Sequence, residues 1–357
     1  MTRTLTIGSH AVSDDGRCYV IAEVGHNHQG SLQICMDLFK AARDAGVHAV
    51  KLQKRNNRAM YTRALYNRPY DNENSYGSTY GAHREALEFG LDEYRTLQQY
   101  CRELGIDFFA TAFDFDSADF LAALDVPAFK IASGDLTNTP LIEHVARFGK
   151  PLIISTGGAA LDDVRRAYET AIALNPHVCL LQCTAGYPAE WRELDLRVIT
   201  SYRELFRDSV VGLSAHDNGI AMAVAAYVLG ARVIEKHFTL NRAWKGTDHA
   251  FSLEPAGMRK MVRDLERTWQ AMGDGRKKMY PSEAGPIQKM GKKLVAARPL
   301  SAGHLLRRED IAIKSPGDGL APYHLNEVVG LVLDQPLDED DEITFAVLKK
   351  ISEFVPL

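Results

Sequence analysis

The sequence lacks several features that would assign it to a broad class at once. Among its 357 residues no apolar run approaches the length of a membrane-spanning helix, and the first ten residues, MTRTLTIGSH, lack the apolar core of a secretory signal. Positive charge is not in excess, because 42 Lys and Arg stand against 46 Asp and Glu, a net charge of −4. These absences argue against nucleic-acid and membrane partners and make the cytosol the expected location.

Cysteine is also scarce, and its spacing does not resemble a metal site. The five cysteines are Cys18, Cys35, Cys101, Cys179 and Cys183. Because the number is odd, CxxC spacing is absent and several lie in apolar runs, we predict buried free thiols rather than disulfides. The 46% hydrophobic and 25% charged residues are ordinary for a globular chain, and the length suffices for a large barrel with a small appendage.

The chain does contain a regular alternation of apolar runs and amphipathic stretches. After a short segment at 4–7 that could start a hairpin, strands are predicted at 19–24, 49–53, 107–112, 128–132, 152–155, 178–183, 210–214 and 232–237. Helices are predicted at 32–45, 91–104, 117–124, 140–148, 161–174, 195–206, 220–229 and 255–272. Eight repeats over about 255 residues indicate an α/β protein built as a (β/α)8 TIM barrel. An open doubly wound sheet is the alternative, but no GxGxxG follows the first strand.

Polar residues gather where the predicted strands end, which is the face that carries the active site of a TIM barrel. They are Glu23, His26, Asn27, Lys51, Gln53, Thr111, Asp114, Lys130, Ser133, Ser155, Thr156, Gln182, Thr184, Tyr187, Ser214, His216, Glu235 and His237. Parallel barrel strands are covered on both faces, so a lysine within one is not explained as a solvated edge residue. We therefore expect Lys51 and Lys130 to point into the barrel mouth, where an anionic ligand would offset their desolvation.

Two histidines end the last two predicted strands. His216 follows the seventh strand and His237 ends the eighth, with one helix between them. Parallel strands joined by a helix are neighbours, so the two imidazoles are expected side by side. Imidazole suits divalent transition metals, but a pair of hydrogen-bonded core histidines explains the pattern equally well.

Two stretches fall outside the repeat. Residues 54–89 form a polar, aromatic-rich insertion between the second strand and its helix, and it is expected either to shape a substrate pocket or to be a surface decoration or dimer contact. Residues 273–288, with three Gly and two Pro, predict a linker between a barrel domain of residues 1–272 and a module of residues 289–357. That module has little room for a core, so it is expected to pack against something larger.

Eight motifs spread along the chain carry a family resemblance. They are AEVGHNHQG (22–30), VKLQK (50–54), FKIASGD (129–135), ISTGG (154–158), LQCTAGYP (181–188), VGLSAH (211–216), EKHFTL (235–240) and GTDHAFSLEP (246–255). Through them essentially the whole chain resembles the sialic acid synthase family, in which a metal-dependent barrel is followed by an antifreeze-like SAF domain. The resemblance implies a transferase that condenses phosphoenolpyruvate with N-acetylmannosamine or a related N-acyl hexosamine, giving N-acetylneuraminate or a related nonulosonic acid and phosphate.

The resemblance also implies roles for single residues. The metal positions correspond to His216 and His237, with Mn²⁺ expected and Mg²⁺ or Co²⁺ as alternatives. The phosphoenolpyruvate-binding positions correspond to Lys51, Lys130, Ser133, Ser155 and Ser214, and the sugar-binding positions to Glu23, Gln53, Tyr187 and Asp248. The catalytic group comprises Glu23, Glu235 and His237. Burial is expected to raise the pKa of both glutamates, and the sequence leaves open which of them takes a proton from the attacking water.

Two departures from the family pattern concern the substrate and the assembly. Ala185 stands in CTAGYP where bacterial members have Asn, and Ser315 follows Lys314 where they have the Arg of KRPG. In the family the SAF domain covers the barrel of the partner chain, so the resemblance implies a domain-swapped homodimer. Any long cationic contact to the partner's site would then have to come from Lys314 or from elsewhere.

The sequence leaves alternatives open for the acceptor sugar and for the class of reaction. The insertion most resembles the animal enzyme that uses the 6-phosphorylated sugar, an N-acetylneuraminate-9-phosphate synthase, and a legionaminic- or pseudaminic-type synthase is a further alternative. The insertion holds enough cations for a sugar phosphate, although exposed arginines are also ordinary: Lys54, Arg55, Arg58, Arg63, Arg68 and Arg84. A metal-independent aldolase would use Lys51 or Lys130 as a Schiff-base nucleophile. The SAF module alone would also be consistent with a carbohydrate-binding protein that has no enzymatic activity.

Overall fold

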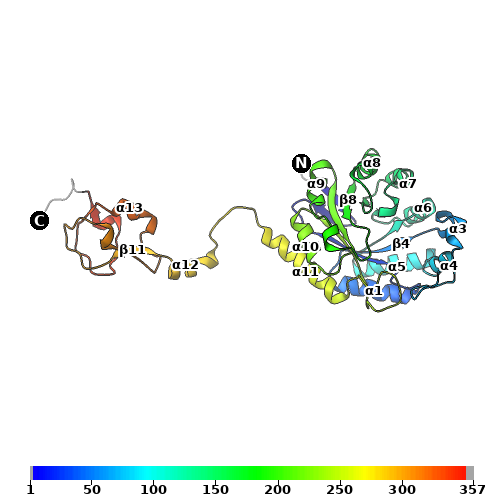
Figure 1. The fold of residues 1–357 in the computed structure, drawn as a ribbon, viewed down its shortest axis with the longest axis horizontal. Helices are drawn as coiled ribbons and strands as arrows, with labels where there is room; N and C mark the ends of the chain where they lie inside the picture. Colours follow the sequence, from blue (N-terminus) through cyan, green and yellow to red (C-terminus); the bar gives the residue numbers. More distant parts are fainter. Residues whose placement is uncertain (1–2, 351–357) are drawn as a thin grey trace. The chain divides into compact units, whose positions relative to one another are not determined.

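The computed structural model describes residues 3–350, which form two compact units that divide between Gly273 and Asp274 (Figure 1). The first unit opens with an antiparallel hairpin of β1 (Thr4–Ile7) and β2 (His10–Ser13). None of the helices in the described part of the chain is both long enough and apolar enough to cross a membrane.

Eight parallel strands close into a barrel, in the order β10-β3-β4-β5-β6-β7-β8-β9. They are β3 (Tyr19–Gly25), β4 (Ala49–Lys54), β5 (Asp107–Ala112), β6 (Phe129–Ile131), β7 (Leu152–Ser155), β8 (Val178–Cys183), β9 (Val210–Ala215) and β10 (Val233–His237). Apart from the outer end of β4 and the first residue of β5, their residues are buried, as expected for strands covered on both faces. The predicted α/β barrel is confirmed.

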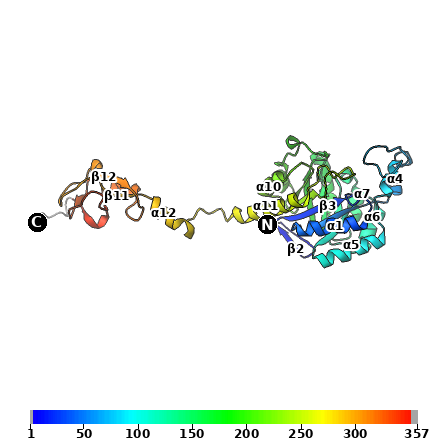
Figure 2. The ribbon, with the colours of Figure 1, turned by 90° about the horizontal axis from the view of Figure 1, so that it is seen from below.

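Helices cover the outside of the barrel, as Figures 1 and 2 show. The principal ones are α1 (Leu32–Asp44), α5 (Leu91–Leu104), α6 (Phe115–Ala123), α7 (Thr139–Ala146), α8 (Leu161–Ile172), α9 (Val198–Leu205), α10 (Ala221–Val228) and α11 (Pro255–Met272). Each buries one apolar stripe against the strands, so that the strand exteriors and the helix interiors form one continuous core.

The predicted element ends differ from the observed ones where a local backbone or capping feature intervenes. Helix α9 begins at Val198 rather than at residue 195, because Asp195 has φ = 38° and a residue in that region does not continue a right-handed helix. Helix α6 begins two residues earlier than predicted, because the Asp114 carboxylate caps it by accepting the Ser117 N–H at 2.8 Å. Strand β6 is three residues long and so shorter than predicted.

The insertion after β4 folds into three short helices and closes on another loop. These helices are α2 (Asn57–Met60), α3 (Arg63–Tyr66) and α4 (Tyr80–Glu85). The Tyr76 hydroxyl donates to the Lys245 carbonyl at 2.6 Å, and the Gly246 N–H donates to Asn74 Oδ1 at 2.8 Å. The insertion therefore lies against the loop that follows β10, at the carboxyl ends of the strands.

The second unit is a small, strand-poor module. It comprises η3 (Pro281–Glu283), α12 (Ala284–Met290), β11 (Lys293–Ala296), η4 (Arg308–Asp310), β12 (Ile311–Lys314), η5 (Pro322–His324), α13 (Leu325–Val328), β13 (Val332–Leu333), η6 (Phe345–Val347) and β14 (Leu348–Lys349). Its apolar core is small and centres on Leu294, Leu306, Ile311 and Leu333. The interval 273–288 is not irregular throughout, since it contains η3 and most of α12.

Candidate active site

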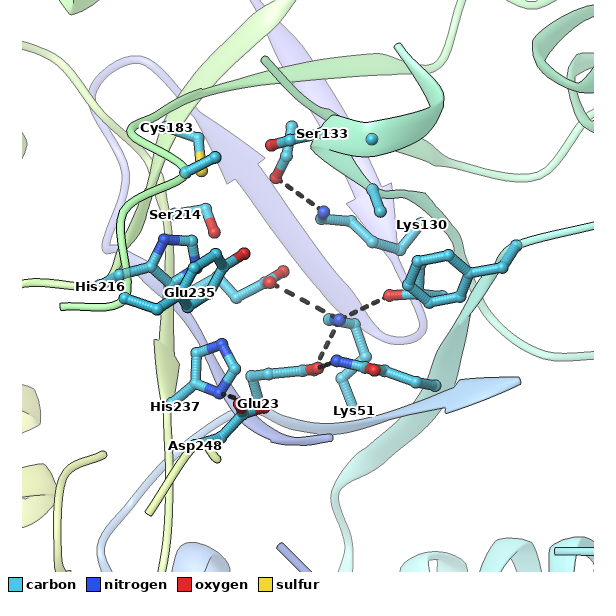
Figure 3. A pocket seen from close by; sticks show the side chains of 18 of the residues that line it. Glu23, Lys51, Lys130, Ser133, Cys183, Ser214, His216, Glu235, His237 and Asp248 are labelled. Carbon is cyan, nitrogen blue, oxygen red and sulfur yellow. Dashed lines mark hydrogen bonds and ion pairs between the residues drawn. The ribbon is translucent and has the colours of Figure 1, made fainter. Parts of the chain in front are cut away.

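A cavity of about 750 Å³ opens at the carboxyl ends of the barrel strands (Figure 3). All of the site residues predicted from the sequence line it: Glu23, Lys51, Gln53, Lys130, Ser133, Ser155, Tyr187, Ser214, His216, Glu235, His237 and Asp248. They come together because every strand of a parallel barrel ends on the same face, so residues separated by about 200 positions in the chain reach one cavity.

Lys51 stands at the centre of a buried hydrogen-bonded group. Its Nζ lies 2.5 Å from Glu23 Oε2 and 3.5 Å from Glu235 Oε1, and it donates to Thr111 Oγ1 at 2.7 Å (Figure 3). The register of the strands makes this possible, because Lys51 is aligned with Glu23 on β3. Burial alone would lower the pKa of Lys51, but the two carboxylates outweigh it and the pKa is raised. Lys51 is therefore a stable cation.

The two glutamates beside Lys51 differ in pKa and in free oxygen atoms. Burial is the largest influence on Glu23 and raises its pKa, as expected. Burial acts in the same direction on Glu235, but the charges of Lys130 and Lys51 outweigh it and lower the pKa, so the expectation for Glu235 is wrong. Glu23 accepts from Gln53 Nε2 at 2.7 Å through one oxygen and forms an ion pair with Lys51 through the other. Glu235 Oε2, in contrast, is buried and has neither a hydrogen bond nor an ion pair within residues 3–350.

The second lysine lies among hydroxyl groups. Lys130 Nζ donates to Ser155 Oγ at 2.7 Å and to the Ile131 carbonyl at 3.1 Å, and burial lowers its pKa. Ser133 Oγ accepts the Gly157 N–H at 2.9 Å, so the loop after β7 reaches the same corner of the cavity. A side chain at position 157 would collide there, because its Cβ would lie 3.0 Å from the Ala185 nitrogen.

The two histidines lie side by side, as predicted. Their strands β9 and β10 are paired, and the ring centroids of His216 and His237 are 5.3 Å apart. His216 Nδ1 donates to the Thr184 carbonyl at 2.8 Å, which leaves the Nε2 lone pair free. His237 Nδ1 is buried, lies 3.6 Å from Asp248 Oδ2 and has no hydrogen-bond partner among the residues that the structure describes.

This donor set fits a divalent transition metal held by two imidazoles. Burial lowers the pKa of His237 and so favours the neutral ring, which is the form that binds a metal. Within residues 3–350 no group of three or more His, Cys, Asp or Glu side chains is arranged to hold an ion. Two protein ligands leave further coordination positions on a cation for water and substrate, as in open catalytic sites.

Two of the residues predicted for the sugar, Tyr187 and Asp248, lie beside the histidines. The Tyr187 side chain is 57% exposed, and its ring centroid is 4.2 Å from that of His216. Gly25 has φ = 53°, and a Cβ atom there would lie 3.2 Å from Gln53 Nε2 and 3.7 Å from Asp248 Oδ2. Gln53 and Asp248 thus converge over a glycine that leaves the space between them open.

Several cavity residues were not predicted as site residues. They include Arg55, Asn74, Arg84, Phe113, Cys183 and Thr247. Arg55 and Arg84 were among the insertion's cations, and their position favours the pocket-shaping interpretation of that insertion. The other four cations do not line the cavity: Lys54 pairs with Glu88, and Arg58, Arg63 and Arg68 are exposed.

Other polar residues at strand ends serve the fold rather than the cavity. Asn27 Nδ2 donates to the Phe238 carbonyl, and Gln182 Nε2 donates to the Leu194 carbonyl. All five cysteines are buried and free, as predicted.

The fold and the cavity together define a TIM-barrel protein whose mouth combines buried lysines with a histidine pair suited to a metal. Residues 38–277 match the model of the NeuB family, and residues 293–349 match that of the SAF domain. The chain therefore belongs to the NeuB family and carries a SAF domain, which confirms the resemblance drawn from the motifs.

Relatives of known name cover most of the chain. It is 39% identical to N-acetylneuraminate-9-phosphate synthase of Homo sapiens, with 91% of each chain covered. It is 35% identical to N,N'-diacetyllegionaminic acid synthase of Legionella pneumophila, covering 90% of this chain and 91% of the relative. Among solved structures, N-acetylneuraminic acid (sialic acid) synthetase from Leptospira borgpetersenii aligns with a TM-score of 0.70 and 29% identity, over 80% of this chain and 96% of the other.

Proposed function

We propose that this enzyme is a transferase that condenses phosphoenolpyruvate with an N-acyl hexosamine to give N-acetylneuraminate or a related nonulosonic acid and phosphate. The observation that carries the proposal is the pair of buried lysines, Lys51 and Lys130, in the mouth of a barrel of the NeuB family. The names of the relatives, synthases of sialic and legionaminic acids, support the same reaction class.

Phosphoenolpyruvate carries a carboxylate and a phosphate, so its site needs fixed cations and hydroxyl donors on two sides. Lys51 and Lys130 supply the cations. The hydroxyl donors are Ser133, Ser155 and Ser214. Because the lysines are only 2% exposed, each contact to the substrate would be made in a water-poor environment, where it is stronger than in bulk water.

His216 and His237 would hold a divalent cation, for which we propose Mn²⁺, with Mg²⁺ or Co²⁺ as alternatives. Bound there, the cation would supply Lewis-acid polarisation of the acceptor's carbonyl group. The residues around the pair would orient the sugar. Gln53 and Asp248 offer an amide and a carboxylate to its hydroxyls, and the Tyr187 ring packs against the His216 ring.

The overall reaction forms one carbon–carbon bond and releases phosphate. C3 of phosphoenolpyruvate bonds to the aldehyde carbon of the open-chain sugar, a water oxygen bonds to C2, and phosphate leaves from the resulting tetrahedral carbon. Glu235 is the better acceptor for the proton of that water, because its Oε2 is free and nearby lysines keep it ionised. Both oxygens of Glu23 are already engaged, which suits a role in holding Lys51 and the sugar.

Release of inorganic phosphate from phosphoenolpyruvate, measured across a panel of hexosamines and their 6-phosphates, tests the proposal. We expect release that depends on an N-acyl hexosamine and on a divalent metal. Absence of release with every sugar, in metal-loaded protein, would overturn it. Borohydride trapping of a pyruvate adduct on Lys51 or Lys130, with activity that resists a chelator, would instead identify a lysine aldolase.

We also propose a domain-swapped homodimer, in which the SAF module of one chain covers the barrel mouth of its partner. The small core of the module and its expected need for a larger packing surface support this arrangement. The cytosol is the proposed location, and the five free thiols support it because reducing compartments keep thiols unpaired.

A further inference from the structure

Two arginines from the insertion, both of which line the cavity, meet at one imidazole. Arg55 Nη1 lies 3.1 Å from His26 Nε2, and Arg84 Nη1 lies 3.2 Å from His26 Nδ1. Arg55 is 7% exposed, and its guanidinium lies over the Phe113 ring at 3.8 Å from the ring centroid. Arg84 donates from Nε and Nη2 to the Tyr80 hydroxyl. Both arginine side chains line the cavity in which substrate would bind.

The charge of this cluster is not matched by acidic partners. Neither guanidinium forms an ion pair with a carboxylate in residues 3–350, and Arg55 Nε is buried without a hydrogen-bond partner. The nearby Glu88 is held by Lys54 at 3.1 Å, and its other oxygen lies 3.8 Å from His26 Nε2. Burying a guanidinium without a paired anion is costly, so an arrangement of two is expected to have an anionic ligand.

His26 cannot accept a hydrogen bond from both arginines at once. A neutral imidazole has one N–H and one lone pair, so it can accept a hydrogen bond from only one of the two arginines. In the other contact, an N–H of the arginine faces an N–H of the imidazole. If the ring were protonated, N–H groups would face each other in both contacts. Burial together with the charges of Arg55 and Arg84 lowers the pKa of His26, which keeps the ring neutral. An oxyanion that accepts from the unmatched guanidinium would relieve the conflict.

We propose that Arg55 and Arg84 bind a phosphate group on the acceptor sugar, so that the preferred acceptor is an N-acyl hexosamine phosphate. This inference rests on the proposed function. Neighbouring side chains lead from the histidine pair, where the acceptor's carbonyl group would bind, to the two arginines. Asp248 lies 3.6 Å from His237, Gln53 and Asp248 converge at Gly25, and the Gln53 amide oxygen accepts from Arg55 Nη2 at 2.6 Å.

The phosphate of phosphoenolpyruvate is a less suitable ligand for the cluster. Lys51 and Lys130 already offer two cations to that substrate. Lys130 and Ser155 lie on the strands β6 and β7, and Ser133 lies in the turn that follows β6. Arg55 and Arg84 come instead from the insertion after β4, next to the sugar-side residue Gln53. Guanidinium groups also suit a phosphate monoester, because each can donate two parallel hydrogen bonds.

The test compares N-acetylmannosamine 6-phosphate with N-acetylmannosamine in the full-length, metal-loaded enzyme. We expect the phosphorylated sugar to have a kcat/KM at least about 100-fold higher, the scale of two charge-assisted hydrogen bonds. In Arg84→Gln, the ratio of the two kcat/KM values should fall about 10- to 100-fold while the KM for phosphoenolpyruvate is retained, and Arg84→Lys should lie between. Arg63→Gln, an exposed arginine of the same insertion, is the matched control and should keep the wild-type ratio.

The outcomes separate this inference from the proposed function. Phosphate release with the unphosphorylated sugar at an equal or higher kcat/KM would overturn the inference and leave the proposed function intact. An equal loss for both sugars in Arg84→Gln, or a raised KM for phosphoenolpyruvate, would also overturn it. If neither sugar supports turnover, the proposed function fails, and calorimetric binding of the two sugars still tests the arginine site. Equal affinity for the two sugars would then exclude the proposed phosphate site at Arg55 and Arg84.

Discussion

The ammonium group of Lys51 lies 2.5 Å from a carboxylate oxygen of Glu23, and both side chains are only 2% exposed. Burying such an ion pair costs several kcal/mol per ion before the attraction between the charges is counted, and a hydrophobic pair would often be as stable. Its presence at the carboxyl ends of β3 and β4, beside Glu235, is therefore better explained by the chemistry of the cavity than by the stability of the barrel.

Removing either cavity lysine should weaken phosphoenolpyruvate turnover. Lys51→Met or Lys130→Met is expected to lower kcat/KM for phosphoenolpyruvate by an amount equivalent to about 2–4 kcal/mol, since each change removes a charge-assisted contact in a water-poor site. Steady-state kinetics with both substrates varied measures it, and Lys260→Met on the exposed face of α11 is the control. A defect confined to the KM of the sugar would contradict the assignment.

The histidine pair should be needed for metal but not for folding. His216→Ala or His237→Ala is expected to abolish turnover and to remove bound metal, because one imidazole cannot replace two ligands. Elemental analysis and circular dichroism measure metal content and fold, with the exposed His177→Ala as the control. If both cavity variants kept more than a trace of activity, the assignment of His216 and His237 as metal ligands would be wrong.

The two glutamates should respond differently to loss of charge. Glu235→Gln is expected to lower kcat by roughly 10²–10⁴-fold with a smaller effect on substrate binding, because it removes the carboxylate with a free oxygen. Glu23→Gln should mainly raise the KM values, because Glu23 holds Lys51 and Gln53. Pre-steady-state and steady-state kinetics separate the two effects, and the reverse pattern would assign the proton transfer to Glu23.

The SAF module should complete the active site of a partner chain. A chain truncated after Met272 is expected to fold as a barrel with little synthase activity, because its cavity is then open to water. In heterodimers with a full-length Lys51→Met chain, the truncated chain's intact barrel should regain activity, which phosphate release measures.

The corresponding controls use verified heterodimers and each homodimer alone. If the heterodimer regained no activity, each SAF module would cover the barrel of its own chain or would cover no barrel. Lys314 is engaged by Asp340 within its own module, so a cationic contact to the partner's cavity is not expected from this residue. A Lys51→Met chain that also carries Lys314→Met should therefore restore the activity of the truncated chain as well as the Lys51→Met chain does.

The sequence by itself determined the barrel and the grouping of its strand-end site residues. Strand and helix periods are local properties of the chain, and alternating them eight times leaves few folds to choose from. Once the strands are parallel, Lys51, Lys130, His216 and His237 must reach one face, so their grouping needs no further information. The ends of helices and strands were predicted less accurately. The pattern of apolar residues does not reveal local backbone features such as the positive φ of Asp195.

The tertiary structure alone decided how the residues of the cavity affect one another. The pKa values of Glu23 and Glu235 move in opposite directions because of where two lysines from other strands lie, and burial alone would have moved both upward. In the same way, the insertion's sequence contains several similar cations, but only its folding over the mouth places Arg55 and Arg84 on opposite sides of His26. Electrostatic interactions depend on distances between residues remote in the chain, and only the folded barrel sets those distances.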